Sequence, residues 1–113
     1  MCYVMAYAGS DLSRWEFERQ TGCGWMGFGR LAIMGLGERG MQPFALDGDR
    51  LVCNGEIYGF HAQRRVLEQK GYRFAGQSDC EILLPMYHEY GLGMFARLDA
   101  EFAMVLYDDA RKR

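Results

Sequence analysis

Apolar residues occur in short runs that glycine and polar residues separate, so the chain is expected to build a fold from many short elements. Residues 2–8 are apolar with β-branched and aromatic members, which predicts a buried first strand. Polar residues follow that run and could cap a helix over residues 12–20. Two further apolar runs, residues 25–28 and 31–34, predict short strands on either side of a glycine-arginine pair.

A hairpin is predicted in the middle of the chain, where residues 43–46 and 49–53 flank the pair Asp47-Gly48. This pair is a preferred two-residue turn between antiparallel strands. Asn54 and Gly55 form a second pair of the same kind, and local sequence alone favours another turn there. A second turn would leave a middle strand of only five residues, which is possible but cramped.

Helical patterns dominate the second half of the chain. Residues 60–70 have amphipathic spacing that Gly71 would end. Ser78 and Glu81 have the spacing of a capping box, in which each side chain bonds the backbone of the other, so a second helix should begin there. Pro85 lies inside this predicted helix and should kink it or end it early, because proline lacks the backbone N–H.

The end of the chain returns to a strand pattern. Residues 91–98 predict a further short helix, and residues 102–107 are apolar at every position, as a strand covered on both faces would be. Strands, helices and a final strand follow one another without a repeating strand-helix-strand unit. This order predicts an α+β layered sandwich.

Composition excludes several classes of function. The chain has 113 residues with 13 basic and 15 acidic side chains, a net charge of −2 that offers no broad attraction to nucleic acid or anionic lipid. Its apolar runs are far shorter than the roughly 18 residues that a membrane helix needs, and its start lacks a cleavable signal. We therefore expect a cytoplasmic protein without a nucleic-acid or membrane partner.

Cysteine spacing predicts neither a metal site nor a disulfide framework. The four cysteines form no C-x-x-C pair, and the two histidines add no ligand-like spacing, so no metal is expected. Outside a secreted protein a disulfide framework is also not expected. Cys23, Cys53 and Cys80 are best interpreted as buried free thiols.

Cys2 differs from these three thiols through its position directly after the initiator methionine. Removal of Met1 would place a thiol and a free α-amine on one residue. The thiol has an ordinary pKa of about 8.5 and the amine one of about 8, so the neutral amine could accept the thiol proton. Asn54 and Gly55 could then supply two donors for the oxyanion that forms when the thiolate attacks a carboxamide.

Motifs along the whole chain match one enzyme family. These are MC at the start, GRLAIMG at residues 29–35, QPF at 42–44, LVCNGEIYGF at 51–60, GYRF at 71–74, SDCEILLPMY at 78–87 and RLDAEFAMVLYD at 97–108. With them the chain resembles the N-terminal glutaminase domain of glutamine-dependent asparagine synthetases, which are class II, N-terminal-nucleophile amidotransferases. The NGEIY segment in particular is similar to the asparagine synthetase branch.

The resemblance implies a role for each matching residue. Cys2 would attack the side-chain amide of glutamine, with its own amine as the base. The Asn54 side chain and the Gly55 N–H would hold the oxyanion. Arg30 would bind the α-carboxylate of glutamine, for which a planar guanidinium is well suited.

The substrate's α-ammonium group would lie between two acids, Glu56 and Asp79. Each of the site residues also has a structural interpretation. Asp79, for example, is favoured near a helix start by the helix dipole without any ligand. Their occurrence together in family order favours the catalytic interpretation.

The chain also departs from the family. Tyr3 stands where the family usually has glycine after the nucleophile, and the arginine-glycine-proline-aspartate loop that closes over glutamine is missing between Gln20 and Gly24. The family domain would also continue beyond Arg113. We therefore interpret residues 1–113 as an incomplete type 2 glutamine amidotransferase domain with part of an αββα sandwich.

The family reaction is glutamine to glutamate plus ammonia, with aspartate amidated in full-length members. The synthetase (ATP pyrophosphatase) domain is absent from these residues, so ATP and magnesium would belong to it and no cofactor is expected here. Glutamine is the expected partner, together with a synthetase domain or second chain that completes the fold. The alternative is a catalytically inactive fragment or binding and assembly module that keeps the charges of the pocket.

Overall fold

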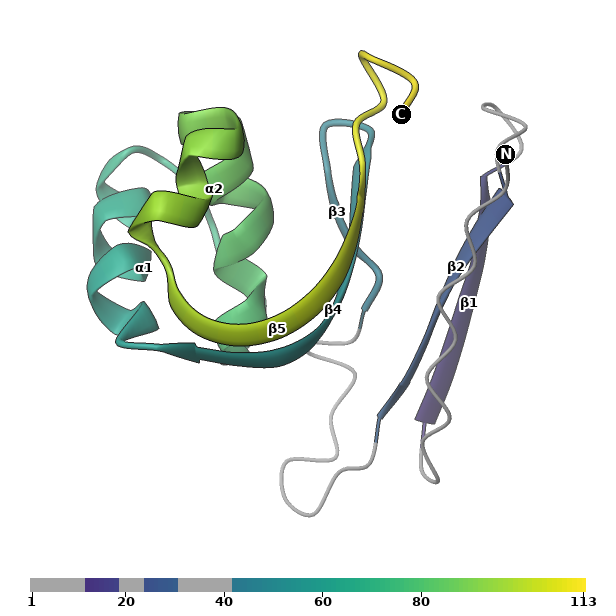
Figure 1. The fold of residues 1–113 in the computed structure, drawn as a ribbon, viewed down its shortest axis with the longest axis horizontal. Helices are drawn as coiled ribbons and strands as arrows, with labels where there is room; N and C mark the ends of the chain where they lie inside the picture. The colour runs from purple at the N-terminus through teal and green to yellow at the C-terminus, as the bar shows by residue number, and fades with distance from the viewer. Residues whose placement is uncertain (1–11, 19–23, 31–41) are drawn as a thin grey trace.

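The structure is a computed structural model that describes residues 12–18, 24–30 and 42–113, the first two segments through their backbone only (Figure 1). These residues form two antiparallel sheets and a group of short helices. The described part is therefore α+β, as the sequence predicts. The strands expected over residues 2–8 and 31–34 lie outside the described residues.

The first sheet is a hairpin of β1 (Leu12–Glu18) and β2 (Gly24–Arg30), paired antiparallel. The helix predicted over residues 12–20 is therefore wrong. Aromatic residues and glutamates alternate in the second half of β1, which is the period of two that a strand requires. β2 includes the glycine-arginine pair at its end, and the strand expected to follow the pair lies outside the described residues.

The second sheet has the order β3-β4-β5, with β3 spanning Phe44–Leu46, β4 Asp49–Tyr58 and β5 Asp99–Tyr107, all antiparallel. The hairpin predicted between β3 and β4 is confirmed. Its turn residues Asp47 and Gly48 have φ angles of 50° and 95°, the left-handed conformation that a tight two-residue hairpin turn uses. Figure 1 shows β4 and β5 curving together around the helices.

Asn54 and Gly55 lie in the interior of β4, opposite Ala103 and Phe102 of β5. The turn that local sequence favours at this pair is therefore wrong. Pairing with β5 extends from Arg50 to Tyr58 and overrides the local preference of an asparagine-glycine pair.

Helix α1 (Phe60–Gln69) confirms the amphipathic pattern, and the chain leaves it at Gly71 with a φ of 100°. Most of its side chains are exposed, and only Leu67 is buried. Gly71 adopts the positive φ that commonly ends a helix, and glycine is favoured there because it lacks a Cβ.

The capping box expected at Ser78 and Glu81 is wrong. The segment begins as a 3-10 helix, η1 (Asp79–Ile82), and the Ser78 side chain makes no capping hydrogen bond. The Glu81 carboxylate instead accepts hydrogen bonds from the N–H groups of Ala75 and Gly76, at 2.6 and 3.0 Å, and so holds the preceding loop.

No interior kink is needed at Pro85. Helix α2 (Leu83–Tyr90) starts only after η1, so Pro85 stands in its first turn, where the backbone N–H has no intrahelical partner in any case. The short helix predicted over residues 91–98 is present as the 3-10 helix η2 (Gly91–Arg97).

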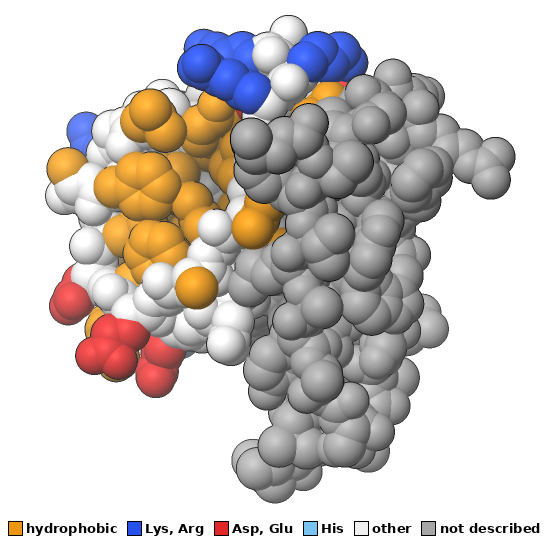
Figure 2. Space-filling view, turned by 45° about the vertical axis from the view of Figure 1, so that its right-hand side comes forward, with side chains coloured by type: hydrophobic (Ala, Val, Ile, Leu, Met, Phe, Trp, Pro, Cys, Tyr) orange, Lys and Arg blue, Asp and Glu red, His pale blue; other side chains and the backbone are white. Residues whose placement is uncertain are grey.

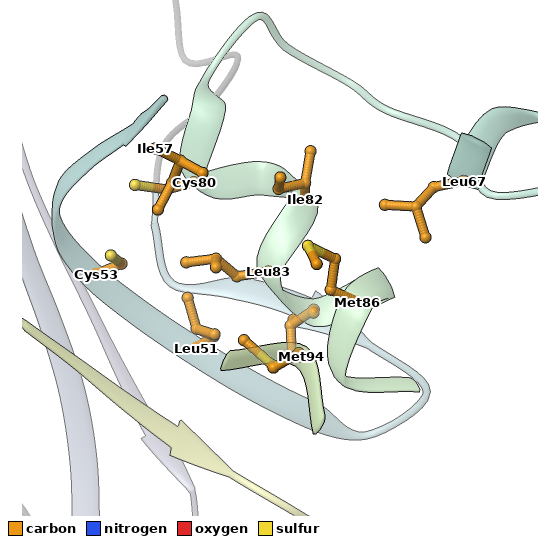
Figure 3. Packing of buried hydrophobic residues seen from close by; sticks show 10 residues of the cluster. Leu51, Cys53, Ile57, Leu67, Cys80, Ile82, Leu83, Met86 and Met94 are labelled. Atoms are coloured by element: carbon orange, nitrogen blue, oxygen red, sulfur yellow. The ribbon is translucent and has the colours of Figure 1, made fainter. Parts of the chain in front are cut away.

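The core lies between the concave side of β4 and the helices that follow it. Figure 3 shows side chains of β4 directed toward those of η1, α2 and η2. Its members are apolar and almost fully buried. They are Leu51, Cys53, Ile57, Leu67, Cys80, Ile82, Leu83, Leu84, Met86 and Met94.

β5 is not covered on both faces as predicted, because within this strand only Tyr107 is buried. Phe102 remains 36% exposed and stacks on Phe95 of η2, with 6.1 Å between ring centroids. In Figure 2 apolar side chains gather on the described face, between basic groups at one end and acidic groups at the other. Within the described residues, every helix is too short or too polar to cross a membrane.

Candidate active site

The candidate residues Asn54, Gly55 and Glu56 lie where β4 extends beyond its neighbour β3. Backbone groups alternate in direction along an antiparallel strand. The two-residue turn makes Leu46 and Asp49 a hydrogen-bonded pair, so the odd-numbered residues of β4 direct their N–H and C=O toward the β3 side. The Gly55 N–H therefore points to this edge, away from β5.

Two side chains bind the β3-side edge of β4 on either side of Gly55. Gln42 is buried and donates from Nε2 to the Cys53 carbonyl at 2.8 Å, and its Oε1 accepts from the Cys53 N–H. Asp79, at the start of η1, accepts from the Ile57 N–H at 2.7 Å through Oδ2. The edge of β4 that carries Gly55 is thus held at Cys53, two residues before Gly55, and at Ile57, two residues after it.

The Gly55 carbonyl has its own partner, the thiol of Cys80, with 3.9 Å between Sγ and the oxygen. A hydrogen bond with the Cys53 thiol, together with burial, raises the pKa of the Cys80 thiol. Cys80 therefore stays protonated at neutral pH, and the Cys53 sulfur and the Gly55 carbonyl share its single S–H proton as acceptors. Cys53 and Cys80 are both buried and neither is in a disulfide, as the sequence predicts, whereas Cys23 lies outside the described residues.

Close packing against β5 requires glycine at position 55. A Cβ placed there would lie 2.5 Å from the Phe102 Cβ and 2.6 Å from the Phe102 Cα, and still closer to the Glu101 carbonyl oxygen. Gly55 therefore has a structural role in the curved β4–β5 pair in addition to any role of its N–H.

Asn54 and Glu56 are exposed and belong to the opposite face of β4 from the core. Glu56 stands directly opposite Glu101 of β5, so two carboxylates share this face. Like charges in such a cross-strand pair repel each other, and a cation bound nearby would relieve the repulsion.

The structure joins four of the six predicted site residues through one strand. Asn54, Gly55 and Glu56 are consecutive in β4, and Asp79 is attached to that strand at the next residue, Ile57. For Arg30 the description is limited to its backbone at the end of β2, opposite Leu12, and Cys2 lies outside the described residues.

Gln42 is the residue whose role sequence reasoning missed. QPF contributed to the resemblance, but nothing in the local sequence indicates a side chain that pairs with a strand backbone. A cavity of about 480 Å³ beside β3, lined partly by Tyr72 and Pro85, contains none of the predicted site residues. Within the described ranges no group of three or more His, Cys, Asp or Glu side chains could hold a metal ion.

Chemically, this edge offers a backbone donor beside a carboxylate. A carboxylate has about four acceptor sites. Asp79 uses one oxygen for Ile57 and the other for the Cys80 N–H at 3.0 Å, so it has acceptor capacity left for a cationic group.

Comparisons with known proteins identify the family. A family model described as a glutamine amidotransferase domain matches residues 1–113. Amidase chry2 of Gibberella zeae is 37% identical over 97% of this chain, which matches 16% of that protein. Asparagine synthetase 1 (glutamine-hydrolyzing) of Saccharomyces cerevisiae is 44% identical over 74% of this chain and 14% of its own length.

The corresponding synthetase 1 of Bacillus subtilis is 32% identical over 96% of this chain and 17% of its own length. The chain thus spans about a sixth of the length of these curated relatives. Because the family model covers residues 1–113, the chain belongs to the glutamine amidotransferase domain family.

Proposed function

We propose that this chain is the glutaminase part of an asparagine-synthetase-like protein and hydrolyses glutamine to glutamate and ammonia. The observation that supports this most is the conformation of the NGE segment. Asn54 and Gly55 are extended at a strand edge, beside the Asp79 carboxylate, and do not form the turn that such a pair commonly forms. A hairpin turn would have left both residues without a catalytic interpretation.

In the proposed reaction the Cys2 thiolate attacks the side-chain carbonyl carbon of glutamine. The α-amine of Cys2 takes the thiol proton and returns it to the leaving nitrogen, so that ammonia departs and a thioester remains. Water then hydrolyses the thioester to glutamate and restores the thiol. Each tetrahedral intermediate carries an oxyanion, which would accept hydrogen bonds from the Asn54 side chain and the Gly55 N–H.

Recognition of the amino-acid head group would use opposite charges at its two ends. Arg30 would bind the α-carboxylate, while Glu56 and Asp79 would accept from the α-ammonium. The repulsion between Glu56 and Glu101 across the strand pair supports a cation at this face. Acceptor capacity on Asp79 beyond its two backbone contacts supports the same assignment.

The activity of the longer protein is also a proposal. Ammonia would pass to an aspartate activated at the expense of ATP, with magnesium, in a synthetase domain or partner chain, and the protein would act in the cytoplasm. We further propose that the described sheet is part of an αββα sandwich. Asp108 and Arg113 exchange two backbone hydrogen bonds, at 2.7 and 3.3 Å, which reverses the chain at the end of β5, as a following strand would require.

Turnover of glutamine by the full-length protein tests the proposal. We expect equal amounts of glutamate and ammonia, measured by mass spectrometry with glutamine labelled at the amide nitrogen. Cys2→Ser should abolish this turnover, whereas the control Cys23→Ser should retain it, and intact mass should show that Met1 is removed. Glutamine binding without turnover in the unsubstituted protein would instead identify an inactive binding module.

A further inference from the structure

Gln42 is a buried polar side chain, 4% exposed, whose two polar atoms both bind one residue of β4. Nε2 donates to the Cys53 carbonyl and Oε1 accepts from the Cys53 N–H. This exchange of one donor and one acceptor is the pattern by which two residues pair in an antiparallel ladder. The Gln42 carboxamide therefore takes the place of a strand backbone.

The register of the hairpin explains why a side chain does this. Phe44 lies opposite Leu51, so continuing the ladder by two residues would place Gln42 opposite Cys53. β3 begins only at Phe44, after Pro43, which has no N–H to contribute to a ladder. The Gln42 side chain supplies the pairing that its own backbone does not make.

The segment with the oxyanion residues is consequently held at two points on one edge. Gln42 binds Cys53, and Asp79 binds Ile57 at 2.7 Å. Gly55 lies midway between them with its N–H on this same edge, and among the described residues nothing accepts a hydrogen bond from that N–H. A backbone donor can stabilise an oxyanion only if its direction is fixed before the reaction.

We propose that Gln42 is a positioning residue for glutamine hydrolysis, which fixes the direction of the Gly55 N–H through its pairing with Cys53. This inference rests on the proposed function of Cys2, Asn54 and Gly55. Gln42 itself is not proposed to contact the substrate. Its loss should therefore weaken interactions that form in the transition state more than those that bind glutamine.

Two substitutions separate the contributions of the carboxamide. Gln42→Met has a similar length but leaves both polar groups of Cys53 unpaired. Gln42→Glu keeps an acceptor for the N–H and places a carboxylate oxygen against the Cys53 carbonyl. Tyr87→Phe is the matched control, because it removes a partly buried hydrogen bond to Asp108, 2.6 Å long, from a different part of the fold.

The full-length protein would be assayed for glutamine turnover, with alkylation of Cys2 by iodoacetamide measured in parallel. Loss of a whole oxyanion donor lowers kcat by roughly 100- to 1,000-fold, so misdirection of one donor should lower it roughly 10-fold or more. We expect this fall in both Gln42 variants, with KM within about 2-fold. Alkylation by iodoacetamide displaces iodide without forming an oxyanion, and its rate should therefore be unchanged.

Hydrogen exchange gives a readout that does not depend on turnover. Amide exchange at Cys53, whose N–H loses its acceptor, should accelerate at least roughly 10-fold in Gln42→Met and remain unchanged in Tyr87→Phe. If Gln42→Met does not fold, the comparison uses Gln42→Glu, which retains one of the two hydrogen bonds.

The possible results separate this inference from the proposed function. Turnover by the unsubstituted protein with an unchanged kcat in the Gln42 variants would overturn the positioning role alone. A rise in KM at constant kcat, or an equal fall in kcat in Tyr87→Phe, would also overturn it. Absence of turnover in the unsubstituted protein would overturn the proposed function and this inference with it.

Discussion

Substitution of Gly55 by alanine tests the packing of the curved β4–β5 pair. The added Cβ would lie 2.5 Å from the Phe102 Cβ, whereas ordinary contact begins at 3.4 Å, so the strands must separate locally by about 0.9 Å. Neither neighbour is the flexible end of a side chain, because the contacts are with the Phe102 Cα and Cβ and the Glu101 carbonyl. The clash cannot be relieved by a rotamer change alone.

Local separation of the strands would lengthen the hydrogen bonds of the adjacent pairs, Asn54 with Ala103 and Glu56 with Glu101. Normal N–H···O distances of about 2.9 Å would approach 3.8 Å, beyond hydrogen-bonding range. Overpacking typically costs about 1–3 kcal/mol and each weakened hydrogen bond roughly 0.5–1.5 kcal/mol. We expect Gly55→Ala to lower the free energy of unfolding by about 3 kcal/mol, and the melting temperature by roughly 10–20 °C.

The assay is urea and thermal unfolding followed by circular dichroism, with Gly93→Ala as the control. A Cβ at Gly93, within η2, would meet no atom within 4 Å. Replacing an unstrained glycine by alanine restricts the unfolded chain, so this control should be neutral or stabilise by up to about 1 kcal/mol. Equal unfolding midpoints for the two variants would refute the close approach of the strands at Gly55.

Three further substitutions test two individual contacts. Asp79→Ala would leave the N–H of Ile57, which is 3% exposed, without its acceptor and should cost about 1–3 kcal/mol in urea unfolding. Asp79→Asn keeps a carbonyl acceptor and should cost less; equal losses would contradict the role of this hydrogen bond. The Tyr87 hydroxyl and the Arg111 guanidinium hold the pKa of Asp108 well below its usual range. The stability that this carboxylate contributes is therefore complete above about pH 4 and is lost as the pH falls further. In urea unfolding measured down to pH 2, the unfolding midpoint of Asp108→Asn should therefore fall less steeply with decreasing pH than that of the unsubstituted protein. An equal dependence of the unfolding midpoint on pH in Asp108→Asn and the unsubstituted protein would contradict the stabilising role of the Asp108 carboxylate.

Short-range signals in the sequence predicted the elements that depend on a few adjacent residues. Asp47 and Gly48 adopt the left-handed conformation of a hairpin turn, and Gly71 follows the helix that it was expected to end. In both cases the chemistry of the turn residues determines the backbone conformation without help from distant residues. These two predictions needed no knowledge of the tertiary fold.

Long-range pairing explains most of the errors. Asn54 and Gly55 resemble a turn as closely as Asp47 and Gly48 do, yet they are extended because β5 pairs with them from almost fifty residues further along the chain. The capping box predicted from the spacing of Ser78 and Glu81 does not form for a similar reason. The Glu81 carboxylate accepts hydrogen bonds from the backbone of the preceding loop and not from the start of its own helix. The local sequence pattern alone does not decide between such partners.

The same limit applies to the site. The resemblance to glutaminase domains indicated Asn54, Gly55, Glu56 and Asp79, and the structure connects these residues through one strand and one hydrogen bond. Gln42 could not be assigned a role, because its pairing with Cys53 depends on the hairpin register and on the start of β3 after Pro43. Both depend on the tertiary structure.

Packing and chemistry place different demands on the two residues of the asparagine-glycine pair. Gly55 must be glycine for the strands to approach each other, so an inactive relative with this fold would need it as much as an active one. Asn54 is exposed, and among the described residues its side chain makes no contact that the fold requires. Stability therefore does not explain its presence, whereas the proposed oxyanion role would account for it. Asn54 is the member of the pair at which a loss of activity can be separated from a loss of structure.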